Sequence, residues 1–353
     1  MKYRKLGRSG LTVSELAIGS MLFGSFATEE ASLNIIAKAR EQGVNFIDTA
    51  DVYVRGKSEE IVGRAITKDR DDWVLATKLG NSMSDNPGPN QRGASRKWIF
   101  QEVEASLKRL DTDYIDILYL HREDRYTPIA ETFRALTDLV RQGKIRYYGI
   151  SNHQSWKLAE YSHLADQAGV DRPAASQLCY NIVNRTPEKE HFHITGYYGQ
   201  GVVTYSALAR GVLTGKYIPG EAPPADSRAG RNDRKMYQTE WREESLHIAQ
   251  RLRQHAEARG ISASEFAVAW VLNNEAVTSV IAGPKTEAQW DTYIRALEYE
   301  FTAEDEALVD SLVTPGHAST PGFLDPSDIQ PLRRPRSAAS AKPTQAPAAV
   351  RAA

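Results

Sequence analysis

Residues 95–121 read SRKWIFQEVEASLKRLDTDYIDILYLH, and this stretch decides the fold because it joins a helix pattern directly to a strand pattern. Ser95 stands where the first turn of a helix needs a cap. Apolar residues follow it at helical spacing: Ile99, Val103, Leu107 and Leu110. Residues 115–120 then form a short apolar run, which is typical of a buried strand. The stretch therefore predicts one helix–strand unit of an α/β protein, with its helix over 97–110.

The same pairing of a short β-rich run with a segment of helical period recurs along the chain. We identify eight strand candidates: 16–19, 45–48, 73–77, 115–120, 147–150, 175–178, 202–206 and 279–282. Alternating strands and helices favour a parallel sheet, and eight such pairs close a (β/α)₈ TIM barrel. The sequence therefore predicts a TIM barrel that forms a single domain over residues 1–330.

Three further segments lie outside the eight units. Residues 3–6 and 11–13 flank a Gly-Arg-Ser-Gly turn and predict an N-terminal β-hairpin that plugs the bottom of the barrel. Helical patterns over 286–297 and 302–312 predict extra C-terminal helices. Residues 331–353 are rich in Ala, Pro, Ser and Arg without hydrophobic periodicity, and this composition predicts a disordered tail.

Bulk composition limits the classes of partner. The 44 Lys and Arg nearly balance the 45 Asp and Glu, for a formal charge of −1, so we expect no nucleic-acid partner and a small-molecule ligand instead. Apolar runs such as 266–272 are too short to cross a bilayer, and no apolar core follows the basic N-terminus, so we expect neither a membrane span nor a secretory signal. Cys179 is the single cysteine, which favours a cytoplasmic protein, and we expect it to be a buried strand residue. The sequence sets no oligomeric state.

Two nucleotide-binding alternatives fail on spacing. No Gly-x-Gly-x-x-Gly follows the first strand candidate, which disfavours a doubly wound dinucleotide fold. Residues 211–216 look like a phosphate-binding P-loop, but they are one residue short between the glycines, and Tyr217 replaces the hydroxyl residue that would bind magnesium. We therefore reject an ATPase.

Four polar side chains lie near the ends of neighbouring strand candidates, where the active site of such a barrel is found. They are Asp48, Tyr53, Lys78 and His121. Their chemistry suits carbonyl reduction, in which negative charge builds on the carbonyl oxygen. Tyr53 can donate a proton to that oxygen, and a nearby Lys78 ammonium favours the phenolate and so eases the transfer. Asp48 would keep Lys78 charged, and His121 would polarise the carbonyl.

Three stretches resemble segments of the aldo-keto reductase family: NFIDTADVY at 45–53, ATK at 76–78 and YIDILYLH at 114–121. The likeness spans Met1 to about Leu312. It implies an NADP-dependent aldo/keto reductase in which Tyr53, Lys78, Asp48 and His121 are catalytic.

The resemblance also implies an NADPH/NADP+ cofactor that lies extended across the barrel mouth. It assigns Ser151, Asn152 and Gln177 to the nicotinamide carboxamide, Tyr205 to stacking on the ring, and Lys285 to the adenosine 2′-phosphate. The remaining cofactor positions are Ser20, Met21, Asp48, Ser206, Leu208, Arg210, Gly211, Lys216, Gly283 and Gln289. Tyr293 stands where the family has an asparagine, so the adenine contact departs from the family pattern.

Other functions remain open at this point. Lys78 at the end of a barrel strand would also suit a Schiff-base aldolase, although Asp48 should keep it charged. A cofactor-binding regulatory subunit, as in channel-associated relatives, is the non-enzymatic alternative. His191 and His193 have a spacing that could suit a metal, but no third ligand is evident, so we expect none.

We expect the substrate pocket to be shaped by long loops and a few apolar side chains. The loop candidates are 81–93, 123–127, 219–237 and 313–328, and the apolar candidates are Phe23, Phe26, Tyr126 and Phe323.

Overall fold

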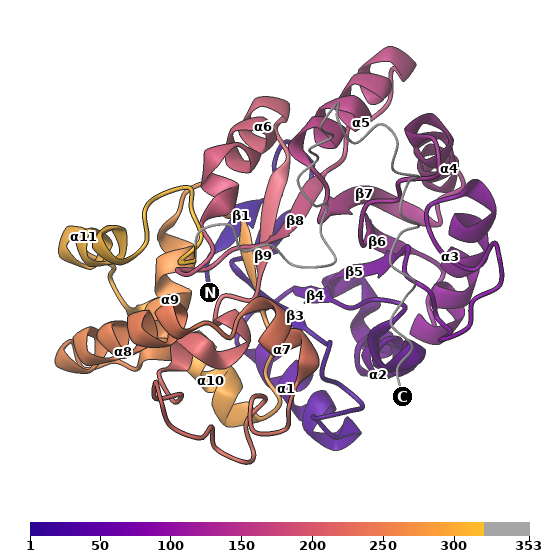
Figure 1. Cartoon of the computed structure of the whole chain (residues 1–353). Coiled ribbons are helices and arrows are strands. Elements are labelled where there is room, and N and C mark those ends of the chain that lie inside the picture. The colour runs from indigo at the N-terminus through magenta and orange to yellow at the C-terminus, as the bar shows by residue number, and fades with distance from the viewer. Residues whose placement is uncertain (321–353) are drawn as a thin grey trace, which may run out of the picture.

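The computed structural model describes residues 1–320, and its centre is a closed barrel of eight parallel strands (Figure 1). Around the barrel the strands follow the order β10-β3-β4-β5-β6-β7-β8-β9. Their bounds are β3 Leu16–Gly19, β4 Phe46–Asp48, β5 Val74–Leu79, β6 Ile115–Leu120, β7 Ile145–Ser151, β8 Ala175–Cys179, β9 Gly201–Tyr205 and β10 Ser279–Ala282. All eight predicted strands are present, and the predicted TIM barrel is confirmed.

Helices surround the barrel and cover the outer face of its strands (Figure 1). They are α1 Glu29–Glu41, α2 Lys57–Ile66, α3 Arg96–Leu110, α4 Ile129–Arg141, α5 Ser155–Ala168, α6 His191–Tyr198, α7 Arg234–Thr239, α8 Glu243–Ala258, α9 Ala263–Asn273, α10 Glu287–Arg295 and α11 Ala303–Leu312. The last two confirm the predicted C-terminal helices. No helix within residues 1–320 combines the length and the apolar character that a bilayer crossing requires.

Helix α3 forms as its sequence pattern predicts. Ser95 is its N-cap, and the Ser95 side chain accepts a hydrogen bond from the backbone N–H of Trp98 at 3.3 Å. The four apolar residues at helical spacing, Ile99, Val103, Leu107 and Leu110, are all buried against the barrel. The helix ends at Leu110, and its C-cap, Asp111, has a φ of 51° in the left-handed region.

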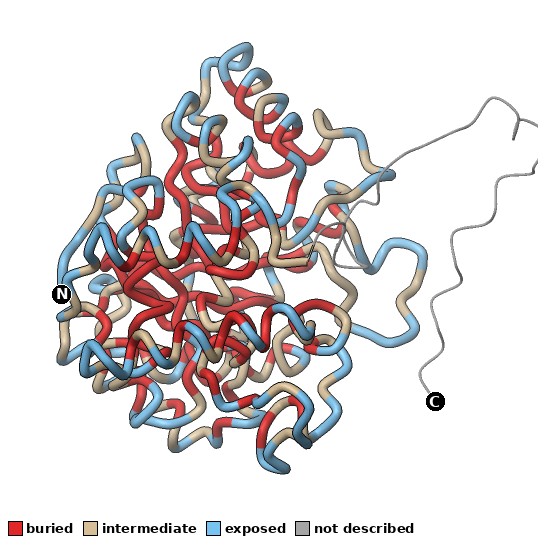
Figure 2. Tube along the Cα trace, turned by 60° about the vertical axis from the view of Figure 1, so that its left-hand side comes forward, coloured by how far each residue is buried: buried red, intermediate tan, exposed pale blue. Residues whose placement is uncertain are grey.

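The buried residues gather at the centre of the molecule, where the trace in Figure 2 is mostly red. Their apolar side chains form two clusters. One cluster lies between the strands and the helices. The other fills the barrel interior and includes Phe46, Ala76 and Ile117. Because the strands are buried on both faces, they read in sequence as nearly continuous apolar runs and do not alternate.

The N-terminal hairpin pairs β1 Tyr3–Lys5 with β2 Thr12–Ser14. Leu6 and Val13 are fully buried in the same cluster as the barrel interior. Gly7, at φ +58°, packs directly against Gly201, the first residue of β9. The contact leaves no room for a side chain, because a Cβ added to Gly7 would lie 2.4 Å from the backbone nitrogen of Gly201. The hairpin therefore lies under the N-terminal ends of the strands, at the bottom of the barrel as predicted.

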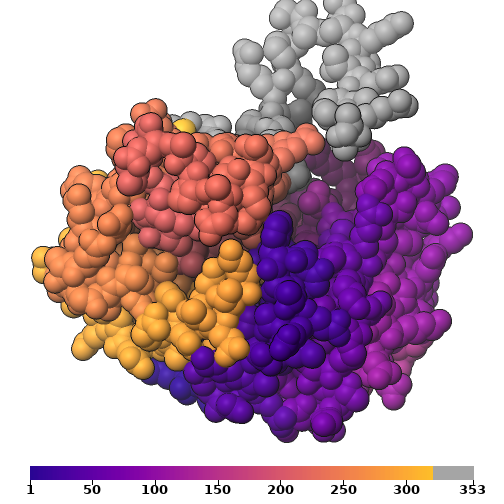
Figure 3. All heavy atoms as spheres, turned by 90° about the horizontal axis from the view of Figure 1, so that it is seen from below, coloured from indigo at the N-terminus to yellow at the C-terminus, as the bar shows by residue number. Residues whose placement is uncertain are grey.

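Closure of the barrel brings the two ends of the domain together. Strand β3 pairs with β10, and on the outside the Lys38 ammonium on α1 donates to Asp291 on α10 at 2.9 Å. Figure 3 shows this meeting as indigo early chain against orange late chain.

Two expectations from the sequence need correction, and a third concerns residues outside 1–320. Strand β5 continues past its predicted end at Thr77, so Lys78 lies within the strand. Cys179 was expected to be buried. It is the last residue of β8 and is only partly buried, because it lines a cavity at the end of the strand. The predicted tail over 331–353, and the part of the domain from 321 to 330, lie outside the described residues.

Candidate active site

A cavity of about 870 Å³ opens at the C-terminal ends of the barrel strands. Asp48, Ser151 and Tyr205, which end β4, β7 and β9, line it together with His121, which follows β6, and Gln177, which lies within β8. This is the end at which TIM barrels place their active sites, because the loops that follow the strands converge there.

Lys78 is the centre of a buried hydrogen-bond cluster at the floor of this cavity. Its ammonium donates to Asp48 Oδ1, to the carbonyl oxygen of Thr49 at 2.8 Å, and to the hydroxyl of Tyr53 at 3.3 Å. An ammonium has three donors, and these partners use all of them. The Lys78 side chain is 1% exposed, so the cluster holds it in one place below the cavity.

Both carboxylate oxygens of Asp48 accept hydrogen bonds from buried side chains. While Oδ1 accepts from Lys78, Oδ2 accepts from the side-chain amide of Gln177 at 2.8 Å. Burial alone would lower the pKa of Lys78, but the negative charge of Asp48 and the contact with Tyr53 more than offset it, and the pKa is raised. Lys78 therefore stays an ammonium at neutral pH.

Tyr53 reaches the same floor from the segment after β4. It begins the short 3-10 helix η1, Tyr53–Gly56, in which Val54 and Arg55 take positive φ values of 48° and 54°. Non-glycine residues rarely adopt this conformation, and such strain is characteristic of functional turns. The turn directs the Tyr53 side chain back over the barrel mouth.

Burial raises the pKa of Tyr53, and the opposing effect of the Lys78 charge does not cancel the rise. The direction differs from the sequence expectation, which considered the ammonium alone. Tyr53 is therefore a protonated phenol, in the state from which a proton can be donated.

His121 follows β6 and faces Tyr53 with its ring edge, at 5.8 Å between ring centroids and an interplanar angle of 84°. Burial lowers the pKa of His121 well below its usual value, and the positive charges of Lys78 and Arg122 lower it further. The ring is therefore neutral near pH 7, with one N–H donor and one acceptor nitrogen. Its Nδ1 is buried and has no hydrogen-bond partner among residues 1–320.

All but one of the residues assigned to the cofactor by resemblance line the cavity. The lining members are Met21, Asp48, Ser151, Asn152, Gln177, Tyr205, Ser206, Leu208, Arg210, Gly211, Lys216, Gly283, Lys285 and Gln289. Ser20 is the exception: it is fully buried, donates to the carbonyl oxygen of Asp48 at 3.1 Å, and contacts the Ser58 hydroxyl at 2.7 Å. Its side chain supports the strand ends and is not part of the cavity wall.

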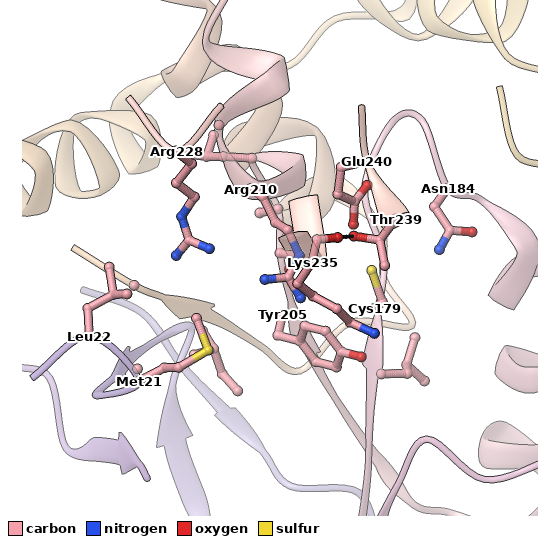
Figure 4. Close-up of a pocket in the computed structure, with 18 of the residues that line it drawn as sticks. Met21, Leu22, Cys179, Asn184, Tyr205, Arg210, Arg228, Lys235, Thr239 and Glu240 are labelled. Atoms are coloured by element: carbon pink, nitrogen blue, oxygen red, sulfur yellow. Dashed lines mark hydrogen bonds between the residues drawn. The ribbon is translucent and has the colours of Figure 1, made fainter. Parts of the chain in front are cut away.

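The segment after β9 fits a dinucleotide phosphate. Ser206, Ala209 and Arg210 have φ values of 61°, 45° and 52°, so the backbone is held in a strained turn at the wall of the cavity. Arg210 Nε is buried without a partner within the described chain, and Figure 4 shows Arg210 beside Arg228 at the cavity. A buried guanidinium nitrogen in this state calls for an anionic oxygen.

Several cavity residues were missed by reasoning from the sequence. Arg228 and Arg231 come from the 219–237 segment, which was recognised only as a long loop, and Arg122 directly follows His121. The guanidinium of Arg231 lies 4.7 Å from the ring centroid of Phe26, so this segment reaches across to the loop after β3. The signal available in the sequence was the group of three closely spaced arginines in 219–237, namely Arg228, Arg231 and Arg234.

The predicted pocket walls are correct only in part. Phe26, two residues of 123–127 and several of 219–237 line the cavity, as does Ala318. Phe23 is fully buried, Tyr126 is 88% exposed, and neither they nor any residue of 81–93 lines the cavity. Phe323 lies outside the described residues.

One of the two histidines considered as metal ligands has a different polar neighbour. His191 Nε2 lies 2.8 Å from the Ser176 hydroxyl. Within residues 1–320 no group of three or more His, Cys, Asp or Glu side chains is arranged to hold a metal ion.

Comparison with known proteins identifies the family of this chain. Residues 15–314 match the sequence profile of the aldo/keto reductase family. The chain is 38% identical over 304 residues to a probable voltage-gated potassium channel subunit beta of Arabidopsis thaliana, which covers 84% of this chain and 92% of that protein. It is 34% identical over 328 residues to an L-glyceraldehyde 3-phosphate reductase of Escherichia coli O157:H7, which covers 90% and 93% of the two chains.

Proposed function

Because this chain belongs to the aldo/keto reductase family, we propose that it is an NADPH-dependent oxidoreductase that reduces an aldehyde or ketone to an alcohol, or runs the reverse reaction. The observation that carries the proposal is the Lys78 ammonium, buried between Asp48 and the Tyr53 hydroxyl. The single cysteine, which can form no intramolecular disulfide, supports a cytoplasmic setting.

Each residue of the cluster has a role that its chemistry supports. When bound, NADPH supplies a hydride to the carbonyl carbon. Tyr53 donates its proton to the carbonyl oxygen, so that the products are the alcohol and a phenolate that solvent reprotonates. Lys78 stabilises the phenolate, and Asp48 and Gln177 hold Lys78 in place. Neutral His121 donates a hydrogen bond to the carbonyl oxygen.

The cavity wall offers groups for each part of the dinucleotide. Tyr205 presents an aromatic ring beside Ser151 and Asn152, which suits a nicotinamide. Arg210 and Lys216 lie after β9 and suit the pyrophosphate, and Lys285 lies after β10, where a cation suits an adenosine 2′-phosphate. Lys285 is the reason for proposing NADPH over NADH.

The aldolase alternative is disfavoured. A Schiff base needs a neutral amine with room for a carbonyl, whereas Lys78 has a raised pKa, donates to three oxygens and is 1% exposed.

The regulatory alternative draws on the relatives named as potassium channel subunits beta. The intact cluster around Lys78 favours catalysis, and the Escherichia coli relative is named as a reductase.

The test is NADPH oxidation across a panel of aldehydes, ketones and sugars with the parent and Tyr53→Phe. We expect turnover with the parent and a loss of roughly 100-fold or more in kcat for the variant, because the proton donor is removed. NADPH binding, measured by fluorescence titration, should be retained. A Tyr53→Phe protein that matches the parent in kcat would overturn the mechanism, and a parent that binds NADPH without turning over any carbonyl would favour the regulatory subunit.

A further inference from the structure

The cavity is strongly cationic although the chain is nearly neutral. Nine Lys and Arg side chains line it against four Asp and Glu, whereas the whole chain has a formal charge of −1. Two of the four carboxylates are already neutralised by buried ammonium groups. Asp48 pairs with Lys78, and Glu123 pairs with Lys157 at 2.8 Å, where both side chains are 8% exposed. This excess of cationic side chains favours anionic ligands, although Arg228 is itself paired with Asp233.

The cationic side chains fall on two opposite sides of the mouth. Lys216 and Arg228 follow β9, and Lys285 follows β10, on the side where the proposed cofactor phosphates lie. Arg122 and Arg125 follow β6, which stands four positions from β10 in either direction around the barrel. They are therefore diametrically opposite the 2′-phosphate position, and the proposed cofactor track leaves them without a ligand.

Arg122 and Arg125 are exposed at the cavity, and the described part of the chain offers them no polar partner. Neither guanidinium makes a hydrogen bond or an ion pair within residues 1–320, and the nearest carboxylate in sequence, Glu123, is held by Lys157. Arg122 directly follows His121, and its positive charge contributes to lowering the pKa of that ring, so the two groups are close. A planar guanidinium with five donors is suited to a carboxylate or a phosphate.

We propose that Arg122, with Arg125 beside it, binds an anionic group of the substrate, so that the substrate is a short carbonyl compound bearing a phosphate or a carboxylate. The inference rests on the proposed function, since it places the carbonyl at Tyr53 and His121. Because Arg122 and His121 line the same cavity, one small molecule can place its carbonyl at His121 and its anionic group at Arg122. Electrostatic attraction also steers such a substrate into the cavity, an effect that salt weakens.

The test compares matched pairs of substrates that differ in charge: succinic semialdehyde with butanal, and glycolaldehyde phosphate with glycolaldehyde. NADPH oxidation is measured for the parent, Arg122→Gln and Arg125→Gln. Arg92→Gln is the control, because Arg92 is an exposed arginine of a neighbouring loop and does not line the cavity. We expect the parent to prefer the anionic member, with carboxylate and phosphate preferences read from the two pairs.

Arg122→Gln should lower kcat/KM for the anionic member by roughly 10- to 100-fold, the usual effect of losing a charge-assisted hydrogen bond, and leave the neutral member within about twofold. Arg125→Gln should act in the same direction but less, and Arg92→Gln should act on neither. A parent that prefers the neutral member, or an Arg122→Gln variant that affects both members equally, overturns the proposal.

Calorimetric titration of the NADP+-loaded protein with glycerol 3-phosphate separates this proposal from the proposed function. Binding that Arg122→Gln abolishes, in a protein that reduces neither these four carbonyls nor any member of the wider panel of aldehydes, ketones and sugars, would uphold the anion site and reject the reductase. Absence of both binding and turnover rejects both. Turnover of the neutral carbonyls alone, without binding of glycerol 3-phosphate, keeps the reductase and rejects the anion site.

Discussion

The Tyr205 hydroxyl donates a hydrogen bond to Asn152 Oδ1 at 2.7 Å, and this bond ties the end of β9 to the end of β7. The amide of Asn152 is used on its other side as well, since Nδ2 donates to the His121 carbonyl oxygen and to the Ser151 hydroxyl, both at 3.0 Å. Asn152 has a φ of 57°, so these bonds hold a strained residue. The ring of Tyr205 is thereby oriented over the cavity before a ligand arrives.

Tyr205→Phe should weaken NADPH binding while the ring is kept. We expect the Kd for NADPH to rise by roughly 3- to 10-fold, which corresponds to the loss of one hydrogen bond of about 1 kcal/mol. Fluorescence titration measures the change, and Tyr205→Leu, which also removes the ring, should weaken binding further. A Tyr205→Phe protein with an unchanged Kd would show that the bond does not orient the ring.

Lys78→Met should abolish turnover and destabilise the fold. The variant removes the charge that stabilises the Tyr53 phenolate, and it leaves Asp48 buried with only Gln177 as a side-chain partner. Breaking one side of a buried ion pair costs about 3–5 kcal/mol. Urea denaturation measures the stability, with Lys97→Met on the exposed face of α3 as the control. The double variant Lys78→Met with Asp48→Asn should recover part of the stability but no activity.

Lys285→Ala should change cofactor choice. Lys285 lines the cavity after β10, and its side chain makes no ion pair within the described residues, so it is available for the 2′-phosphate. We expect the Kd for NADPH to rise by roughly 10- to 100-fold and the Kd for NADH to stay within about twofold. Equal affinity of the parent for both cofactors would contradict the assignment of Lys285.

The free energy of unfolding should fall as the pH drops from about 6.5 to about 4. Burial lowers the pKa of His153 to about 4 and that of His191 to about 4, against about 6.5 in an unfolded chain. Within that window the unfolded state binds more protons, so acid favours unfolding, and each histidine contributes roughly 1–3 kcal/mol that is lost on acidification.

Urea denaturation at several pH values checks this dependence. His153→Gln should flatten it, because glutamine does not titrate, and the exposed His247→Gln is the matched control. Stability of the parent that is unchanged between pH 6.5 and pH 4 would contradict the prediction.

Much of the fold could be predicted from short stretches of sequence. The spacing of Ile99 and Val103 placed α3, and the runs before Asp48 and His121 placed β4 and β6, because side-chain period and helix capping are local properties. The buried cluster around Lys78 was predictable for the same reason: its members stand at or near the ends of strands that a barrel must bring to one mouth.

Other features depended on contacts between distant parts of the chain. Ser20 and Phe23 face inward and not into the cavity, and only the packed loops decide that direction. The pKa of Tyr53 is raised because burial outweighs the Lys78 charge, and burial exists only once the barrel closes. The sequence by itself determined which elements form and which strand ends meet at the mouth, since both follow from local period and strand order. Tertiary structure alone decided that Arg122 and Lys285 line one cavity, because residues so far apart in sequence come together only when β3 pairs with β10 and the barrel closes.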